Sequence, residues 1–458
     1  MTFIRRVLNY YRDPGYFSEL LKLALPIILQ QLVFSLLNMV GVVFVGQKGD
    51  VAVAAVGLAG QIAFLLNLVH FGIVSGAAMF TAQFYGSLDI PSLRRVLGMC
   101  LALALSAAAI FFTVAQVSPE MFLRIYSKDP AVLALGVGYM RIFSWSFLFT
   151  AITSSYAMVM RSTGDVRTPT IIGSLVLVLN TLLSYALIFG KFGLPELSIN
   201  GAAVATLISR AVECVALLLV IYSRKAPVAA SLRELTNFDL AFSKRVLRPM
   251  VPVIFNELFW SLGVTAYAAI YGHMSTDAYA AVNIVASIEQ VAFVVFNGIA
   301  SATAVMVGHR IGAGREDEAH LYAGLSLGLC VVGGVTEGIL LQFLKMPILS
   351  LFNVTPDVIH NASLLLIVSS TFLWVRANNM TIVVSILRAG GDTKYSLFLD
   401  GIIIWIVGVP LTAFGAFVLH LPVYWVAVCV MAEEVTKWTL GIRRYRSRKW
   451  INNLAHAK

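Results

Sequence analysis

The sequence predicts an all-α integral membrane protein with twelve transmembrane helices, in two six-helix lobes related by a pseudo-two-fold axis near the membrane normal. An apolar composition, twelve apolar runs of membrane-spanning length and an internal repeat support this prediction. The chain has 458 residues, of which 59% are hydrophobic and 12% are charged, and its mean hydropathy is +0.85. Because soluble domains carry about 25% charged residues, the composition excludes an ordinary soluble domain.

Apolar runs long enough to cross a bilayer define the predicted helices. The first six are 21–45, 52–79, 93–117, 131–160, 168–190 and 199–222. The last six are 250–272, 279–307, 321–344, 358–387, 396–419 and 422–441. The first twenty residues lack an apolar core and a cleavage site, so they predict an interfacial lead-in rather than a signal peptide.

Basic residues are concentrated on one side of the predicted membrane. Most of the 33 Lys and Arg fall in the N-terminus, the loops after even-numbered helices and the C-terminal tail. By the positive-inside rule, both termini should be cytoplasmic. The net charge of +10 follows from this asymmetry and does not indicate nucleic-acid binding. The tail from Arg443 to Lys449, followed by Trp450, predicts an anchor at an anionic leaflet.

The two halves of the chain match one another. Pro26 aligns with Pro252, and with one further residue of offset RSTGDVR, from Arg161, aligns with RAGGDTK, from Arg388. Since six crossings return each half to its starting side, the repeats run parallel, as in transporters that alternate access around a central cleft. The predicted parts are an N-terminal lobe, a cytoplasmic linker and a C-terminal lobe with a basic tail: 1–222, 223–248 and 249–458.

The repeated RxxGD segments each end a long span. Glycine permits a tight turn there, and an aspartate can cap the helix that follows. We therefore predict that Asp165 and Asp392 are helix caps that serve the same structural need in both halves.

Glu257, in the stretch PVIFNELFW, is an acid inside a membrane span. It lies about 10 Å from the start of its helix, where an ionised carboxylate costs several kcal/mol unless it is paired, protonated or bound to an ion. In the alignment of the halves it lies opposite Gln31, so only one half carries the charge. We predict that Glu257 is an ion-coupling group that binds H⁺ or Na⁺.

A structural ion pair is the alternative for Glu257, with Arg376, Arg141 or Arg210 as its partner. Helical spacing pairs other internal acids with bases on their own helix: Glu213 with Arg210, and Glu433 and Glu434 with Lys437. Three further internal acids have no evident partner in the sequence: Glu289, Glu337 and Asp400.

Amide and hydroxyl side chains inside the spans could line an ion or substrate site. The candidates are Asn256, Asn283, Asn378, Asn379, Gln31, Asn180, Ser184 and Thr206, and Arg376 is a further possible contact of the ion or substrate. A Na⁺ site near Glu257 would need several such oxygens, whereas a proton needs only the carboxylate, which favours the proton. Each amide could instead bond across helices as a packing contact, and the same role is expected for His70.

Several segments resemble the multidrug and toxic compound extrusion (MATE) transporters. They are LALPIILQQ, VAVAAVGLA, MRSTGDVRTP, VLNTLLSYALIFGKFGLPELSINGAAVAT, VGHRIGAG and LRAGGDTKYS. The likeness covers essentially the whole chain, and the terminal EEVTKWTLGIRRYRSRKWINNL resembles a bacterial branch of the family. The resemblance implies two lobes of six helices and export of organic cations in exchange for Na⁺ or H⁺.

The same resemblance implies roles for individual residues. Glu257 matches the second-lobe acid linked in the family to cation coupling. Positions of a first-lobe cation site are matched by Asn180, Ala202 and Thr206. Two departures argue against ion binding in the first lobe, because Gly41 and Ser184 stand where the family commonly has Asp.

We therefore expect a monomeric, multi-pass transporter of a bacterial plasma membrane that exports small organic cations by alternating access in exchange for H⁺ or Na⁺. We expect no other cofactor, no enzymatic activity and no nucleic-acid partner. A flippase for a lipid-linked precursor is the alternative. A cleft lined by many arginines would favour anionic lipid headgroups, whereas the internal arginines here are few: Arg141, Arg210 and Arg376. A membrane-embedded transferase is more remote, because neither DDxxD nor HxxxxD occurs in the chain.

Overall fold

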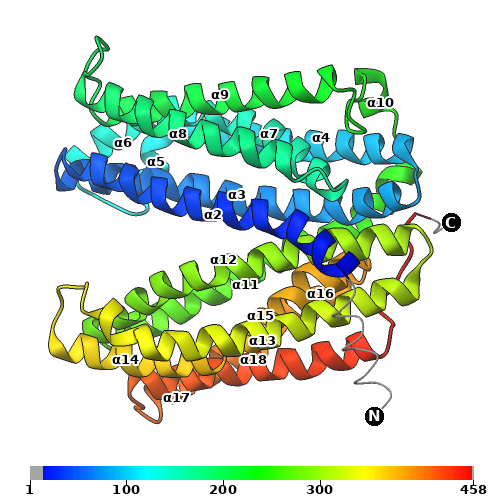
Figure 1. Cartoon of the computed structure of the whole chain (residues 1–458). Helices are drawn as coiled ribbons and strands as arrows, with labels where there is room; N and C mark the ends of the chain where they lie inside the picture. The colour runs from blue at the N-terminus through cyan, green and yellow to red at the C-terminus, as the bar shows by residue number, and fades with distance from the viewer. Residues whose placement is uncertain (1–13, 456–458) are drawn as a thin grey trace. The chain divides into compact units, whose positions relative to one another are not determined.

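The computed structural model describes residues 14–455, which form helices joined by short loops (Figure 1). No β-strand occurs within this range. The predicted interfacial lead-in falls largely on residues 1–13, outside the described residues.

The first half consists of long helices that coincide with the first six predicted spans. They are α2 (Pro14–Gly46), α3 (Asp50–Gly86), α4 (Ile90–Val117), α6 (Pro130–Phe143), α7 (Ser146–Ser162), α8 (Arg167–Phe189) and α9 (Ile199–Ser223). Two short helices lie between them or follow them: α5 (Pro119–Arg124) and α10 (Leu232–Thr236). The α10 helix begins with a capping box, in which Ser231 and Glu234 bond each other's backbone N–H groups.

The second half repeats this order with more irregular helices. Its elements are α11 (Leu240–Met274), α12 (Thr276–Gly312), α13 (Glu316–Leu349), α14 (Pro356–Thr371), α15 (Leu373–Met380), η1 (Thr381–Leu387), α16 (Thr393–Ser396), η2 (Leu397–Ile402), η3 (Ile404–Gly408), α17 (Val409–Phe417) and α18 (Val423–Arg446). The three η elements are π-helical. Such segments change the register of the side chains that follow and are frequent at functional sites.

Helices of membrane-spanning length confirm the predicted fold class. Among the described residues, nine helices are long and apolar enough to cross a bilayer, and two bent pairs, α6 with α7 and α14 with α15–η1, bring the number to as many as 11. The twelfth predicted span is α18, whose middle carries charged side chains. Six of these spans come from each half of the chain.

The bend in each pair occurs at matching places in the two halves. The axes turn by 46° between Phe143 and Ser146, and by 54° between Thr371 and Leu373. Since the RxxGD alignment carries residue 145 onto Phe372, the bend belongs to the duplicated frame.

The described residues form two compact units, each with its own internal contacts. One contains residues up to Ile28, Ala82–Leu88 and the chain from Leu247 onward, and the other contains Leu29–Thr81 and Asp89–Val246. Three helices, α2, α3 and α11, therefore continue from one unit into the other. The lobe limits at residues 222 and 249 stay predictions, since these units follow contacts rather than chain order.

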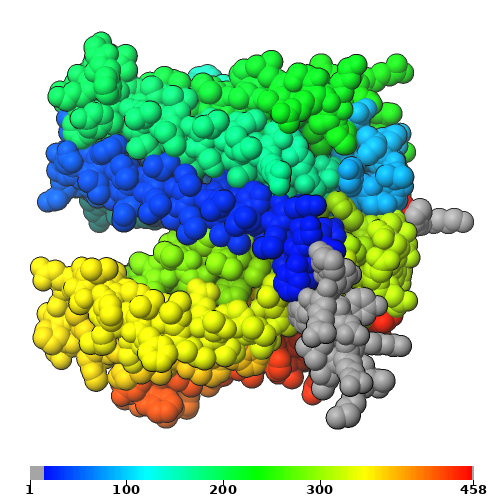
Figure 2. Space-filling model, in the orientation of Figure 1, coloured from blue at the N-terminus to red at the C-terminus, as the bar shows by residue number. Residues whose placement is uncertain are grey.

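Apolar side chains cover outward faces of the helices, as expected of spans in a bilayer. On α2, which runs across the face seen in Figure 2, Leu25, Leu29, Leu36 and Met39 are exposed. Small residues occupy the helix contacts instead: a methyl group on Gly201 would meet the backbone of Leu187 in the α8–α9 pair.

The basic C-terminal tail differs from the predicted anchor. Trp450 is fully buried in an apolar cluster of the second half, so it is not an interfacial aromatic residue. Arg444 pairs with Asp392 at 2.6 Å and Arg448 with Asp317 at 2.5 Å. The prediction was wrong for Trp450 and Arg444, because sequence composition cannot show that the tail folds back onto its own bundle.

Candidate functional site

Glu257 forms a buried ion pair with Arg388. The Nη2 atom of Arg388 donates to Oε1 of Glu257 at 2.6 Å, and the two side chains are 2% and 10% exposed. Glu257 lies within α11, and Arg388 directly follows the π-helical η1. A charge-assisted bond between two buried groups offsets part of the cost of burying each charge.

The first half contains the corresponding arginine with an uncharged partner. The Nη2 atom of Arg161 donates to Oε1 of Gln30 at 2.9 Å. Arg161 and Arg388 are the aligned residues of the two RxxGD segments. The first-half residue that corresponds to Glu257 is therefore Gln30, rather than Gln31. Gln31 is exposed. The prediction that only one half carries the acid holds, with the register moved by one residue.

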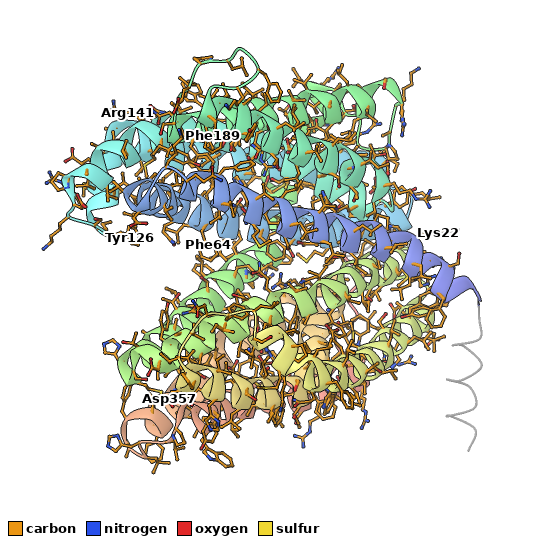
Figure 3. The ribbon with its side chains drawn as sticks, turned by 60° about the vertical axis from the view of Figure 1, so that its left-hand side comes forward. Lys22, Phe64, Tyr126, Arg141, Phe189 and Asp357 are labelled. Carbon is orange, nitrogen blue, oxygen red and sulfur yellow. The ribbon has the colours of Figure 1, made fainter. Side chains whose placement is uncertain are left out.

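The partners suggested for Glu257 from the sequence are engaged elsewhere. Arg376 pairs with Glu289 at 2.6 Å, and Arg210 pairs with Glu213 at 2.6 Å, as the helical spacing predicted. Arg141 is exposed on α6 (Figure 3). The three suggestions were wrong because the true partner, Arg388, lies 131 residues away from Glu257 and was interpreted only as part of a turn.

A cavity of about 220 Å³ lies inside the second half. Charged side chains on its wall are Glu289, Arg376, Glu433, Glu434 and Lys437, and aromatic ones are Trp260, Tyr267 and Tyr271. Carboxylates outnumber cations on this wall, so the cavity suits a positively charged ligand with an apolar body.

Lys437 is shared by two carboxylates beside the cavity. It pairs with Asp400 at 2.9 Å and with Glu433 one helical turn away, as predicted, while the Tyr267 hydroxyl donates to the other oxygen of Glu433. A methyl group on Gly408 would meet Oε2 of Glu433 at 2.6 Å, so glycine leaves the space for this contact. One ammonium group thus balances two acids, with one of them bound to a tyrosine.

The predicted amide ligands separate into two groups. Two lie in the charged network: Asn256 donates to Asp400 at 3.0 Å, and Asn379 donates to Glu434 at 2.7 Å. Asn283 and Asn378 donate to the preceding turn of their own helices, as packing amides do. Asn283 is also exposed, so the structure does not bring it to Glu257.

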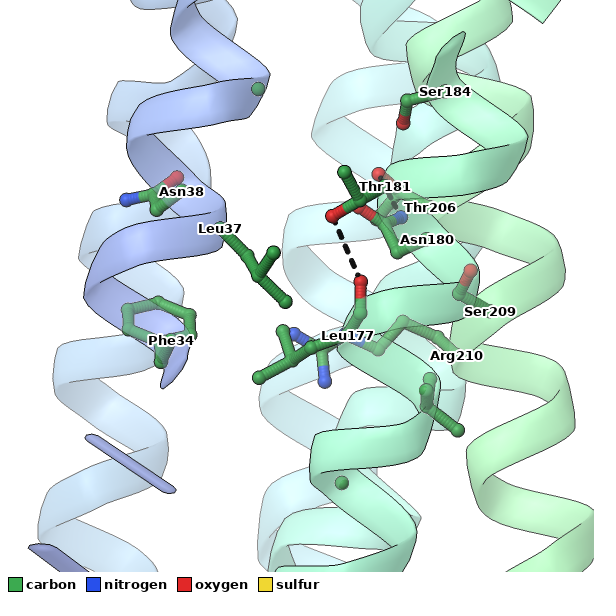
Figure 4. Close-up of a pocket in the computed structure, with 13 residues that line it drawn as sticks. Phe34, Leu37, Asn38, Leu177, Asn180, Thr181, Ser184, Thr206, Ser209 and Arg210 are labelled. Carbon is green, nitrogen blue, oxygen red and sulfur yellow. Dashed lines mark hydrogen bonds between the residues drawn. The ribbon is translucent and has the colours of Figure 1, made fainter. Parts of the chain in front are cut away.

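The first half contains a second cavity, of about 170 Å³, between α2 and the α8–α9 pair (Figure 4). Its polar wall consists of Asn38, Asn180, Thr181, Ser184, Thr206, Ser209 and Arg210, together with Gly41 from α2. Asn180 donates to the Thr206 hydroxyl at 3.3 Å, as the match to a first-lobe site suggested. No carboxylate lines this cavity within the described residues, because glycine and serine occupy the positions where Asp was expected.

Two smaller predictions have opposite outcomes. Asp165 caps α8 by accepting the N–H of Thr168 at 3.1 Å, which confirms its role. Asp392 makes no cap bond and pairs with Arg444 instead, so the prediction for the second turn was wrong. His70 bonds the Ala104 carbonyl as a packing contact, as expected.

The fold and these interior charges define a membrane transport protein built from two repeats. The MatE family model matches residues 26–186 and 252–414, which is more than half of the chain. The chain therefore belongs to the MatE family, which is a family of transporters rather than enzymes.

Curated relatives cover almost the whole chain. A probable multidrug resistance protein NorM from Thermotoga maritima is 27% identical over 440 residues, covering 95% of this chain and 94% of that protein. A probable multidrug resistance protein YoeA from Bacillus subtilis is 29% identical over 87% of this chain and 86% of that protein.

Solved structures share the fold at low sequence identity. The Vibrio cholerae MATE transporter VcmN in the bent form has a TM-score of 0.85 at 18% identity, covering 96% of this chain and 99% of that one. A MOP superfamily transporter from Pyrococcus furiosus, described as having a binding pocket of reversed polarity, has a TM-score of 0.81 at 18% identity over 94% and 96% of the two chains.

Proposed function

We propose that this transporter exports organic cations in exchange for H⁺ or Na⁺ by alternating access. We place it in a bacterial plasma membrane with both termini in the cytoplasm. The excess of carboxylates over cations in the second-half cavity carries the proposal. The acids on its wall are Glu289, Glu433 and Glu434, and the cations are Arg376 and Lys437, of which Lys437 also pairs with Asp400.

The wall of the cavity favours an organic cation over an inorganic one. Trp260, Tyr267 and Tyr271 line it together with the acids. Aromatic faces attract cations and pack against flat apolar groups. A bound organic cation would balance the negative charge that Arg376 and Lys437 leave uncompensated. The multidrug resistance described for the relatives agrees with such a substrate class.

Glu257 is the coupling group in this proposal. Arg388 neutralises it in the described state, so it needs no further cation there. In a state where the pair separates, the buried carboxylate needs a proton or Na⁺ in place of the guanidinium. The coupling ion and Arg388 would then compete for Glu257, and the two states would differ in ion affinity.

Either H⁺ or Na⁺ serves as the coupling ion in this proposal. A proton needs only the carboxylate. For Na⁺, Asn256 Oδ1 and Asn379 Oδ1 are buried acceptors that have no hydrogen-bond partner among the described residues. Exchange of one monovalent cation for another moves no net charge and avoids a cost of about 2.3 kcal/mol per 100 mV, so the ion's concentration gradient supplies the drive.

Efflux of ethidium from proteoliposomes, with an imposed pH or Na⁺ gradient, tests the proposal. We expect gradient-driven efflux by the intact protein and none by Glu257→Gln. The control is Glu196→Gln, which removes a loop carboxylate paired with Lys48 at 2.5 Å outside the spans and should leave efflux intact. Efflux that needs Na⁺ and survives an uncoupler would identify Na⁺ as the ion. No efflux under either gradient would contradict the proposal and favour the flippase alternative.

A further inference from the structure

The end of α18 and the segment that follows it fold back onto the turn that carries Arg388. This stretch, residues 444–454, is called the latch below. Trp450 is its buried anchor, fully enclosed in the apolar cluster that also contains Ile386 and Leu387 of η1. The Trp450 indole N–H donates to the Tyr445 carbonyl at 3.1 Å.

The latch contacts the backbone of the 388–392 turn directly. The carbonyl of Gly390 accepts the backbone N–H of Asn452 at 2.9 Å and the side-chain amide of the same residue at 3.0 Å. A methyl group on Gly390 would lie 2.5 Å from the Trp450 ring, so the latch closes on a residue without a side chain. Gly391 has φ +73° and would bring its own methyl group against Leu454.

Gln83, at the end of α3, links the turn and the latch. Its side-chain N–H₂ donates to the Ala389 carbonyl at 2.7 Å and to the Asn452 carbonyl at 3.1 Å, and its Oε1 accepts the N–H of Leu454 at 2.6 Å. Gln83 is fully buried and belongs to the same compact unit as the turn. All three bonds hold backbone groups, so they fix the path of the chain at this point.

The aspartates of the two RxxGD turns have different partners. There, Asp165 caps the next helix by itself. In the second half, Asp392 makes no cap and is bound by Arg444 of the latch at 2.6 Å. The second turn is therefore bound by a residue of the latch, at the position next to the buried Arg388.

We propose that the latch positions Arg388 against Glu257. It holds the four residues that follow Arg388, so that the guanidinium keeps the depth and direction that the ion pair requires. Arg444, Trp450, Asn452 and Gln83 act as positioning residues, because they reach Glu257 only through the turn. The effect of the latch on transport rests on the proposed function, whereas its effect on the turn does not.

Hydrogen exchange of the full-length protein in lipid nanodiscs tests the structural part. We expect amides of residues 389–392 to exchange at least about tenfold faster in Trp450→Ala and Arg444→Ala, with residues 161–168 unchanged as an internal control. Arg446→Ala is the matched control, because Arg446 is an exposed base of the same tail. Unchanged exchange at 389–392 in both latch variants would overturn the proposal. If Trp450→Ala does not fold, Trp450→Phe makes the same test with a smaller change.

Ion dependence of efflux tests the functional part. We expect Gly390→Ala and Arg444→Ala to shift the ion concentration for half-maximal efflux by about threefold or more, and Arg446→Ala to leave it unchanged. A variant that lowers only the maximal rate, with the same ion dependence as the intact protein, would overturn a positioning role. If the intact protein shows no cation efflux, the proposed function fails, and the exchange experiment still decides whether the latch holds the turn.

Discussion

The two halves place an arginine at the same point of the repeat and give it different partners. In the first half, the half-buried Arg161 bonds the amide of Gln30, and its Nε has no partner among the described residues. In the second half, Arg388 is buried against the carboxylate of Glu257. The aligned contact is present in both halves, and in the second half it joins two charged groups.

The helices around these arginines differ in the same direction. The first-half counterparts, α7 and α8, are regular α-helices, whereas η1, η2 and η3 interrupt the matching segments of the second half. The η1 segment ends beside Arg388, and the η2 segment contains Asp400. Both are charged residues of the site. Irregular backbone thus occurs beside Arg388 and around Asp400, whereas Arg161, the first-half counterpart of Arg388, lies on a regular α-helix.

The largest expected effect is that of removing the shared cation of the second half. Lys437→Met would leave Asp400 and Glu433 without their common partner, at a cost of about 3–5 kcal/mol. Thermal unfolding of the detergent-solubilised protein measures the loss. Lys449→Met, in the exposed part of the tail, is the control. Adding Glu433→Gln should recover part of the stability, and a variant with Lys437→Met alone that unfolds like the intact protein would contradict the shared-cation arrangement.

Glu257→Gln converts the second-half contact into the first-half one. Because Arg161 and Gln30 show that an arginine–amide contact is compatible with this fold, we expect a folded protein destabilised by about 2 kcal/mol, without coupled efflux. Thermal unfolding and the ethidium assay measure the two parts separately. Coupled efflux at the normal rate would remove Glu257 from the coupling mechanism.

The reverse change, Gln30→Glu, builds the second-half pair into the first half. A double-mutant cycle with Arg161→Gln should give a coupling of about 1–2 kcal/mol between residues 30 and 161. The same cycle with Gln31→Glu should give none, since Gln31 is exposed. A coupling at residue 31 instead of residue 30 would return the alignment of the halves to its sequence-based register.

The smallest effect concerns the linker helix α10, which the second half lacks. The backbone N–H of Ser231, and then Arg94, bond the Glu234 carboxylate and hold its pKa below the ordinary value. A lowered folded-state pKa contributes stability above the ordinary Glu range, near pH 4.3, that is lost as the pH falls through the folded value. Arg94→Gln should therefore move the acid opening of residues 231–236 to higher pH.

Limited proteolysis of the linker between pH 3 and pH 7 follows this opening. Arg95→Gln serves as the control, because Arg95 is the neighbouring base and its guanidinium lies over the Phe242 ring. The same opening pH in Arg94→Gln and in the intact protein would show that Arg94 does not set it.

Much of the architecture followed from the chain alone. Apolar runs placed all twelve spans because the bilayer sets their length, and the repeat was visible in its matching prolines and RxxGD segments. Pairs within one helix, such as Glu213 with Arg210, followed from helical spacing. Glu257 was identified because a carboxylate inside an apolar run is costly and therefore informative wherever it occurs.

The partners of the buried charges were decided only by the tertiary structure. Arg388 with Glu257, Arg376 with Glu289 and Arg444 with Asp392 join residues far apart in sequence, and no local periodicity relates them. A shift of one residue between the repeats was enough to hide the equivalence of Gln30 and Glu257. The composition of the chain determines which charges must be compensated inside the membrane, and the packing of the helices determines which group compensates each of them.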